Sequence, residues 1–361
     1  MAYNYTRLEN FLRTNEDNDE MWNDEDNLYK AVNGFNKNGS DFSDSMYQSS
    51  ILYCAYLYIK KVGLNPNEEK MFGKIDRNLT FEEFIRRINQ LKSTTVPFLD
   101  NRTETLYARF YRVMGNKVDF GDWGWIRFYR DGLIKDDHKT KKEDEEQYRI
   151  YLPVKNKDLH KFALQLMIEC ENQGITWHFK TNNSMDNMER CDNVVIYTGE
   201  QDFPKHISVI QAIRTRYPEI EFGHTPLLAS NYNDYIAVAP ESAEIAKQES
   251  YTSNMASTLQ YLRGRNHFNI DAFVESAKKA MSTRLARTEE FIDTHRDIPT
   301  IEPSSDLSAE DISRIVSADL KPKDIAEASR ELTTTDVKKG GNFITRLIHK
   351  IMSRFTNSPE K

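Results

Sequence analysis

Three cationic side chains lie in or beside short β-type runs in the middle of the chain, and their types suggest recognition of a multiply charged anion. Arg149 lies in YRIYLPV, Lys180 ends ITWHFK, and Arg190 precedes NVVIYTG. A sheet holds such side chains more rigidly than a loop could. Guanidinium and ammonium groups that converge suit phosphate, because arginine donates paired hydrogen bonds to its oxygens. We therefore expect Arg149, Lys180 and Arg190 to bind phosphate.

Strand alternation predicts the faces on which these side chains lie. In YRIYLPV, Arg149 and Tyr151 share one face, and in ITWHFK, Lys180 shares a face with His178. Each of these residues, taken alone, is more often an ordinary exposed side chain. Because they occur at comparable positions of adjacent strands, a common site and a set of ordinary exposed side chains are equally good interpretations.

Several standard sites are absent from the sequence. It contains no G-x-x-x-x-G-K-[ST], G-x-G-x-x-G, H-E-x-x-H, C-x-x-C or G-x-S-x-G motif, and its eight histidines are scattered. We therefore predict no metal site and no cofactor. The three cysteines cannot build a disulfide framework, which indicates a reducing compartment.

Short motifs follow one another in order through this window. They are R-I-Y-L at 149–152, F-K at 179–180, R-x-D-x-x-V-x-Y at 190–197, T-P-L at 225–227, a strand end at 235–240 and the helix start E-S-Y at 249–251. In this order they resemble the HopPsyA family of bacterial type III effectors. The domain of that family also occurs as the lyase component of class V lanthipeptide biosynthesis. The resemblance covers about residues 145–265.

Through that family the chain is distantly similar to phosphothreonine lyases, which remove phosphate from phosphothreonine by β-elimination. In those enzymes a Lys-x-His pair on one strand supplies the base and the acid. Here the strand reads Arg149-Ile150-Tyr151, which is a departure from the pattern. Arginine is always protonated and is a poor base, and a phenol is a weaker acid than an imidazolium group. The F-K segment and Arg190 are retained.

The resemblance implies an elimination that other residues could carry out. Neighbouring cations would favour the neutral amine of Lys180, which could act as the base. Arg149 and Arg190 would clamp the phosphate, and Tyr151 or His178 would supply a proton. The expected substrate is a phosphorylated protein of a host, or a phosphorylated precursor peptide in lanthipeptide maturation. The alternative is a non-catalytic effector or adaptor that binds a partner protein at this sheet face. Such a protein could bind its partner at a membrane surface. The missing Lys-x-His pair favours the alternative.

The elements that must position these residues predict an α+β fold. Residues 1–134 form a helical N-terminal region in which Thr80 and Glu83 make a capping box; within it, GDWGWIRFYRDG is a strand or bent hairpin. Residues 147–296 form a mixed β-sheet domain flanked by helices, because strand and helix patterns alternate there. The expected strands span 148–154, 175–180, 193–199, 223–228 and 235–241, and the expected helices span 157–174, 203–217, 249–263 and 270–295.

The C-terminal part is predicted to be a polar linker (297–341) followed by a basic amphipathic helix (342–356). The helix would place apolar residues on one face and cations on the other, which is typical of a helix that packs on the protein body or binds an anionic membrane surface. The residues expected to contact the membrane or a partner are Phe343, Ile344, Leu347, Ile348, Ile351 and Phe355 on the apolar face and Arg346, Lys350 and Arg354 on the basic face.

Composition limits the remaining possibilities. The chain has 361 residues, of which 39% are hydrophobic and 29% charged, and its net charge of −7 argues against nucleic-acid binding. It contains no apolar run of about 18 residues that could span a bilayer and no N-terminal signal-peptide pattern. We therefore expect a cytoplasmic protein, with peripheral membrane association or delivery into a host cell as further possibilities.

Overall fold

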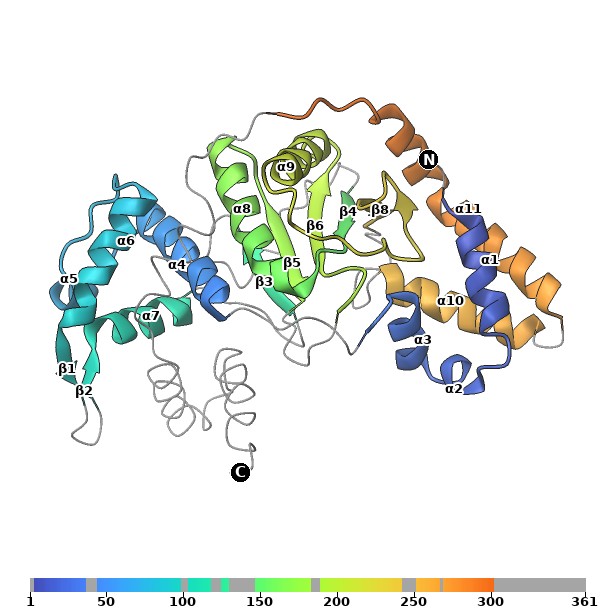
Figure 1. Ribbon diagram of the computed structural model, residues 1–361, viewed down its shortest axis with the longest axis horizontal. Helices are drawn as coiled ribbons and strands as arrows, with labels where there is room; N and C mark the ends of the chain where they lie inside the picture. The colour runs from blue at the N-terminus through green and yellow to red at the C-terminus, as the bar shows by residue number, and fades with distance from the viewer. Residues whose placement is uncertain are drawn as a thin grey trace.

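A six-stranded antiparallel sheet forms the centre of the molecule, with helices on both faces (Figure 1). The computed structural model describes residues 3–36, 44–98, 103–117, 125–129, 147–182, 189–241, 251–266 and 269–301. The strand order is β3-β5-β6-β4-β8-β7. The strands are β3 (Trp125–Tyr129), β4 (Gln147–Leu152), β5 (His178–Asn182), β6 (Val194–Gly199), β7 (Ser230–Asn231) and β8 (Ala237–Pro240), and a separate hairpin pairs β1 (Thr95–Pro97) with β2 (Thr103–Thr105).

Eleven α-helices surround this sheet within the described ranges, so the predicted α+β class is confirmed. They are α1 (Tyr5–Thr14), α2 (Asp19–Trp22), α3 (Glu25–Val32), α4 (Asp44–Lys61), α5 (Pro66–Phe72), α6 (Phe81–Gln90), α7 (Leu106–Lys117), α8 (Leu159–Asn172), α9 (Phe203–Arg216), α10 (Tyr251–Asn266) and α11 (Ile270–Thr294). None of these described helices is long and apolar enough to cross a bilayer.

Alternation along β4 divides the core into two layers. Tyr148, Ile150 and Leu152 point to the layer that holds α8 and α9, while Tyr151 points to the opposite layer. That opposite layer packs Tyr151 and Val195 against α10 and the first helices of the chain. The face that the sequence predicted for the cationic residues is therefore the face toward α10.

The N-terminal helices divide into two groups that lie on opposite sides of the sheet domain (Figure 1). Helices α1–α3 pack on α10 and α11 through one apolar cluster, which includes Leu8, Leu28 and Phe273. Helices α4–α7 join the other cluster through α8, where Cys54 contacts Met167. The capping box of α6 forms as expected, since Thr80 accepts from the Glu83 amide and Glu83 accepts from the Thr80 amide.

Two expected elements differ from the observed ones. ITWHFK begins as irregular chain, and β5 starts only at His178 because Ile175 and Trp177 pack into the core beside the end of α8. GHTPLL, expected as a strand, contains no strand; its backbone carbonyls accept hydrogen bonds from side chains of the N-terminal segment instead. The segment GDWGWIRFYRDG supplies one strand, β3, which pairs with β5.

The first residues after α11 pack on the body of the protein. Tyr232 donates to the carbonyl of His295, and Ser208 donates to the carbonyl of Pro299 at 2.7 Å. Ile298 and Ile301 lie against the main apolar cluster. The remainder of the predicted linker and the predicted amphipathic helix at 342–356 lie outside the described residues.

Candidate functional site

A row of aromatic and charged side chains crosses the face of the sheet toward α10. Arg149 on β4 is the register partner of Tyr197 on β6, and its guanidinium lies 5.3 Å from the centre of the Tyr197 ring. His178 on β5 stacks on the same tyrosine, with ring centres 4.5 Å apart. His178 and Tyr197 are both partly exposed. The sequence-predicted residues Arg149 and His178 are thus brought to one ring.

Arg149 has a carboxylate partner that sequence reasoning missed. Its guanidinium makes two hydrogen bonds to Glu241, one of them 2.8 Å long from Nη2 to Oε1. The side chains of Arg149 and Glu241 are only 9% and 11% exposed. Burial acts to lower the pKa of Arg149, but the Glu241 carboxylate outweighs burial and the pKa is raised. Arg149 is therefore a buried, neutralised cation.

The other two predicted cations, Lys180 and Arg190, both contact the ring of Trp125 on β3. The Lys180 amine lies 4.0 Å from the centre of the Trp125 ring, and the Arg190 guanidinium lies 4.3 Å from the same centre. Such contacts stabilise cations on the negatively polarised ring face. Lys180 shares its strand face with His178, so this tryptophan cluster adjoins the row described above. Trp125 lay within a segment predicted as a strand, but nothing in its spacing indicated this contact.

Arg190 is enclosed by partners. It binds Asp192 through two hydrogen bonds of 2.7 and 2.9 Å and donates to the Tyr29 hydroxyl at 2.7 Å. Its side chain is 8% exposed and its guanidinium also lies 4.3 Å from the centre of the Phe35 ring. Burial acts to lower the pKa of Arg190, but Asp192 reverses the effect and the pKa is raised. The R-x-D spacing of the sequence was the signal that could have revealed this pair.

Tyr151 lies deep in the layer beneath α10. It is 1% exposed, and its hydroxyl has no hydrogen-bond partner among the described residues. Burial raises the pKa of Tyr151 well above its usual value of 10.0. Of the two predicted proton donors, the partly exposed His178 is consequently better placed than Tyr151.

The arrangement brings the predicted residues onto one face but into two clusters. Lys180 and Arg190 meet at Trp125, whereas Arg149 and His178 meet at Tyr197. The lysine and the histidine are the partly exposed members, and the two arginines are buried with carboxylates. The Nε2 atom of His178 is nevertheless buried, and a phosphate group would have to compete with Glu241 or Asp192 for an arginine.

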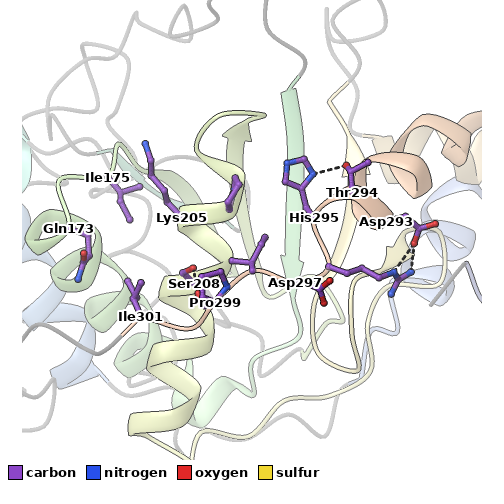
Figure 2. Close-up of a pocket in the computed structure, with 13 residues that line it drawn as sticks. Gln173, Ile175, Lys205, Ser208, Asp293, Thr294, His295, Asp297, Pro299 and Ile301 are labelled. Atoms are coloured by element: carbon purple, nitrogen blue, oxygen red, sulfur yellow. Dashed lines mark hydrogen bonds and ion pairs between the residues drawn. The ribbon is translucent and has the colours of Figure 1, made fainter.

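Two of the cavities among the described residues are large enough for a small ligand. One, of about 480 Å³, is reached between α1 and the segment before β6, and Arg190 lines it together with Arg7 and Cys191. The other, of about 440 Å³, lies between the start of α9 and the segment after α11 (Figure 2). Figure 2 shows Lys205, Ser208 and His295 around it, and none of the sequence-predicted site residues lines it. No group of three or more His, Cys, Asp or Glu residues that could hold a metal ion occurs in the described parts of the chain.

A model of a known protein family matches the central part of the chain. Residues 106–259 match the HopA1 effector protein family, so the resemblance predicted from the motifs is confirmed over that segment. An effector protein from Pseudomonas syringae pv. syringae strain 61 is 11% identical, with a TM-score of 0.44 over 77% of this chain and 93% of that chain. An effector protein from Pseudomonas syringae pv. tomato strain DC3000 is 14% identical, with a TM-score of 0.37 over 72% and 86% of the two chains. No curated protein matches the sequence.

Proposed function

We propose that this chain is an effector that eliminates phosphate from phosphothreonine or phosphoserine in a protein or peptide, at the sheet face that carries Lys180 and His178. One observation carries the proposal: the Lys180 amine and the Arg190 guanidinium share the Trp125 ring, and His178 stands on the same face of the strand. A base, an acid and a cation are thus gathered within two adjacent clusters. The match to an effector family supports action inside a host cell.

The proposed reaction needs no cofactor. Lys180 as the free amine would remove the Cα proton of the phosphorylated residue, and the electron pair of that bond would form the Cα–Cβ double bond. The Cβ–O bond would break, and its electron pair would leave with the phosphate, which His178 would protonate. The products are a dehydro residue and inorganic phosphate, with one proton moved from substrate to enzyme and one from enzyme to phosphate.

Binding of the substrate phosphate requires an exchange of partners at an arginine. A phosphate dianion near Arg190 or Arg149 would compete with Asp192 or Glu241, and it carries more charge than either carboxylate. The substrate expected on these grounds is a flexible phosphorylated segment, because its phosphate must reach groups that lie below the surface. This favours a loop or a peptide over a phosphorylated residue within a folded element.

Mass spectrometry of phosphothreonine and phosphoserine peptides tests the proposal. Incubation with the full chain should remove the mass of phosphoric acid, and Lys180→Ala should lower the rate at least about 100-fold if a general base is lost. Lys155→Ala, which removes a lysine outside the two clusters, is the matched control and should retain the rate. Loss of the phosphoryl group with retention of the hydroxyl would mean hydrolysis and would overturn the mechanism, as would full turnover by Lys180→Ala.

A second function, binding of a partner protein without catalysis, is favoured by a different observation. Both arginines of the face are already neutralised and buried by Glu241 and Asp192, as in a structural network rather than an open anion site. Unchanged peptide mass together with measurable binding of the phosphorylated and unphosphorylated forms alike would support this function. Binding that depends on the phosphate would instead support the first.

A further inference from the structure

The cavity of about 480 Å³ is built from segments that are distant in the sequence. Arg7 comes from α1, Gly34 from the turn after α3, Lys155 from the chain after β4, and Glu189 and Cys191 from the segment before β6. This volume is within the usual range for small-ligand sites, which is about 300–1,000 Å³. Lys180 and His178, which carry the proposed elimination, are not among the residues that line the cavity.

Among the arginine and lysine side chains that line the cavity, one has no carboxylate partner in the described parts of the chain. Lys155 binds Glu189 at 2.8 Å, and Glu189 also accepts from the Asn156 amide. Arg190, which lines the same cavity, is neutralised by Asp192. No ion pair between described residues involves Arg7, whose Nη1 donates to the carbonyl of Thr225 at 2.7 Å. The uncompensated charge facing the cavity is therefore that of Arg7.

The T-P-L segment fixes the position of this arginine. Thr225 accepts the hydrogen bond from Arg7, and two residues later the carbonyl of Leu227 accepts from the Tyr3 hydroxyl at 2.8 Å. Tyr3 is 4% exposed and Arg7 is partly buried. The segment just before α1 and the first turn of α1 are thus both held to the same loop, so the guanidinium is oriented before a ligand arrives, which lowers the entropic cost of binding.

We infer that this cavity binds the side-chain carboxylate of an acidic residue of a peptide or protein partner, through Arg7. A single uncompensated guanidinium matches a monoanion and offers it two parallel hydrogen bonds. A phosphate dianion would call for a second free cation, and Lys155 and Arg190 are already paired. Phe222 and Pro153, also in the lining, supply apolar surface for the methylene groups next to the carboxylate.

Cys191 provides a reporter in the unmodified chain. It lines the cavity and is partly buried, whereas Cys54 and Cys170 are both buried in the core. Burial raises the pKa of the Cys191 thiol to about 11, with the nearby Arg7 guanidinium acting in the opposite direction. Because Cys191 is partly exposed and the other two cysteines are buried, alkylation by iodoacetamide at mildly alkaline pH should occur at Cys191 first, and peptide mass spectrometry can follow its rate.

The test compares N-acetyl-glutamate amide with its neutral glutamine analogue and with inorganic phosphate at equal concentration and ionic strength. We expect the glutamate compound to slow alkylation of Cys191 at least threefold, and the other two to have little effect. In Arg7→Gln this protection should disappear, and Arg7→Lys should restore part of it. Arg13→Gln, on the same helix, is the matched control and should keep full protection. Lys180→Ala should keep it too, which separates this site from the proposed elimination.

Each other outcome contradicts the inference. Equal protection by the neutral analogue, or none by the glutamate compound, would exclude a carboxylate site. Stronger protection by phosphate would exclude the monoanion assignment. Because Arg7→Gln could loosen α1, circular dichroism and the alkylation rate without ligand accompany it. Protection that survives in a folded Arg7→Gln variant would remove Arg7 from the site.

Discussion

At the scale of single residues, the two arginines of the sheet face pair with carboxylates that lie at very different distances along the chain. Asp192 is two positions after Arg190, so the pair lies within one short motif. Glu241 is 92 positions from Arg149, and only the pairing of β4 with β8 brings them together. A single sequence shows which residues are cationic and which face they share. It does not show which distant anion neutralises them, because that depends on strand order.

Removal of the Glu241 charge should destabilise the fold. In Glu241→Gln the buried Arg149 guanidinium loses its counter-ion, and we expect the free energy of unfolding in urea to fall by about 3–5 kcal/mol. The double variant Arg149→Met/Glu241→Met should recover most of that loss, because no charge is then left buried. Glu221→Gln breaks the exposed pair with Lys157 and serves as the control, with an expected change much smaller than that of Glu241→Gln, because solvent screens exposed ion pairs. A loss of similar size in the control would argue against burial as the cause.

Two buried histidines predict how stability depends on pH. His206 is 1% exposed beside Thr198, and burial lowers its pKa from 6.5 to about 4; burial likewise lowers the pKa of His160 to about 3. The unfolded chain therefore takes up these protons before the folded chain does. The free energy of unfolding should be constant above pH 6.5 and fall from there toward pH 4, by up to about 1.4 kcal/mol per pH unit for each histidine.

Urea unfolding measured across that pH range checks this dependence. His206→Gln should reduce the slope between pH 6.5 and 4, whatever its effect on stability at neutral pH. His224→Gln, at an exposed position, should leave the slope as it is in the unchanged chain. An identical slope in all three proteins would mean that His206 does not contribute.

At the scale of elements, local sequence signals were sufficient to predict a helix or strand wherever residues within or next to that element determine where it ends. α8 ends at Asn172 and α9 at Arg216, within two residues of the predicted ends at 174 and 217, because Gly174 adopts a φ of 64° and Pro218 follows Tyr217. GHTPLL has the apolar content of a strand, but its backbone carbonyls accept hydrogen bonds from Arg7 in α1 and from Tyr3 just before α1. Its partners Tyr3 and Arg7 lie more than 200 positions earlier in the sequence, and no local pattern reveals contacts of that kind.

The capping box of α6 gives a prediction at this scale. Thr80→Ala removes the side chain that accepts from the Glu83 amide and the partner of the Glu83 carboxylate. We expect a loss of about 1 kcal/mol in the free energy of unfolding, measured in urea. Thr283→Ala, at an exposed site inside α11 where the hydroxyl only bonds its own helix, should cost less than about 0.5 kcal/mol. Equal effects would mean that the cap does not stabilise α6.

At the scale of the whole molecule, the predicted helical N-terminal region is used in two separate places. Figure 1 shows α1–α3 beside α10 and α11, and α4–α7 on the other side of the sheet. The sequence predicted helices in this region, but a helical pattern states only that a helix has an apolar face. Which element covers that face is decided by the path of the chain, so the sequence alone predicted a single helical region at 1–134.

Trp22 tests how much the first group contributes to the fold. It is 4% exposed, meets the Phe273 ring with centres 5.4 Å apart, and donates its indole N–H to the Asn15 carbonyl. Trp22→Ala should lower the free energy of unfolding in urea by about 3–5 kcal/mol, since it leaves a cavity between α2 and α11. Tyr261→Ala on α10 removes a ring that is 62% exposed and should change stability by less than about 0.5 kcal/mol. A Trp22 effect no larger than this would show that α1–α3 contribute little to stability.

The contact between α1 and α11 also sets an order of events during synthesis. The Tyr3 amide donates to a Glu289 oxygen at 2.6 Å, across 286 positions of the chain. At a translation rate of about 5–20 residues per second, the first helices leave the ribosome on the order of 15 to 60 seconds before their partner helix exists. Leu8, Leu12 and Leu28 remain without their final neighbours during that interval. The nascent chain thus presents an apolar surface to chaperones until almost all of the described fold has been made.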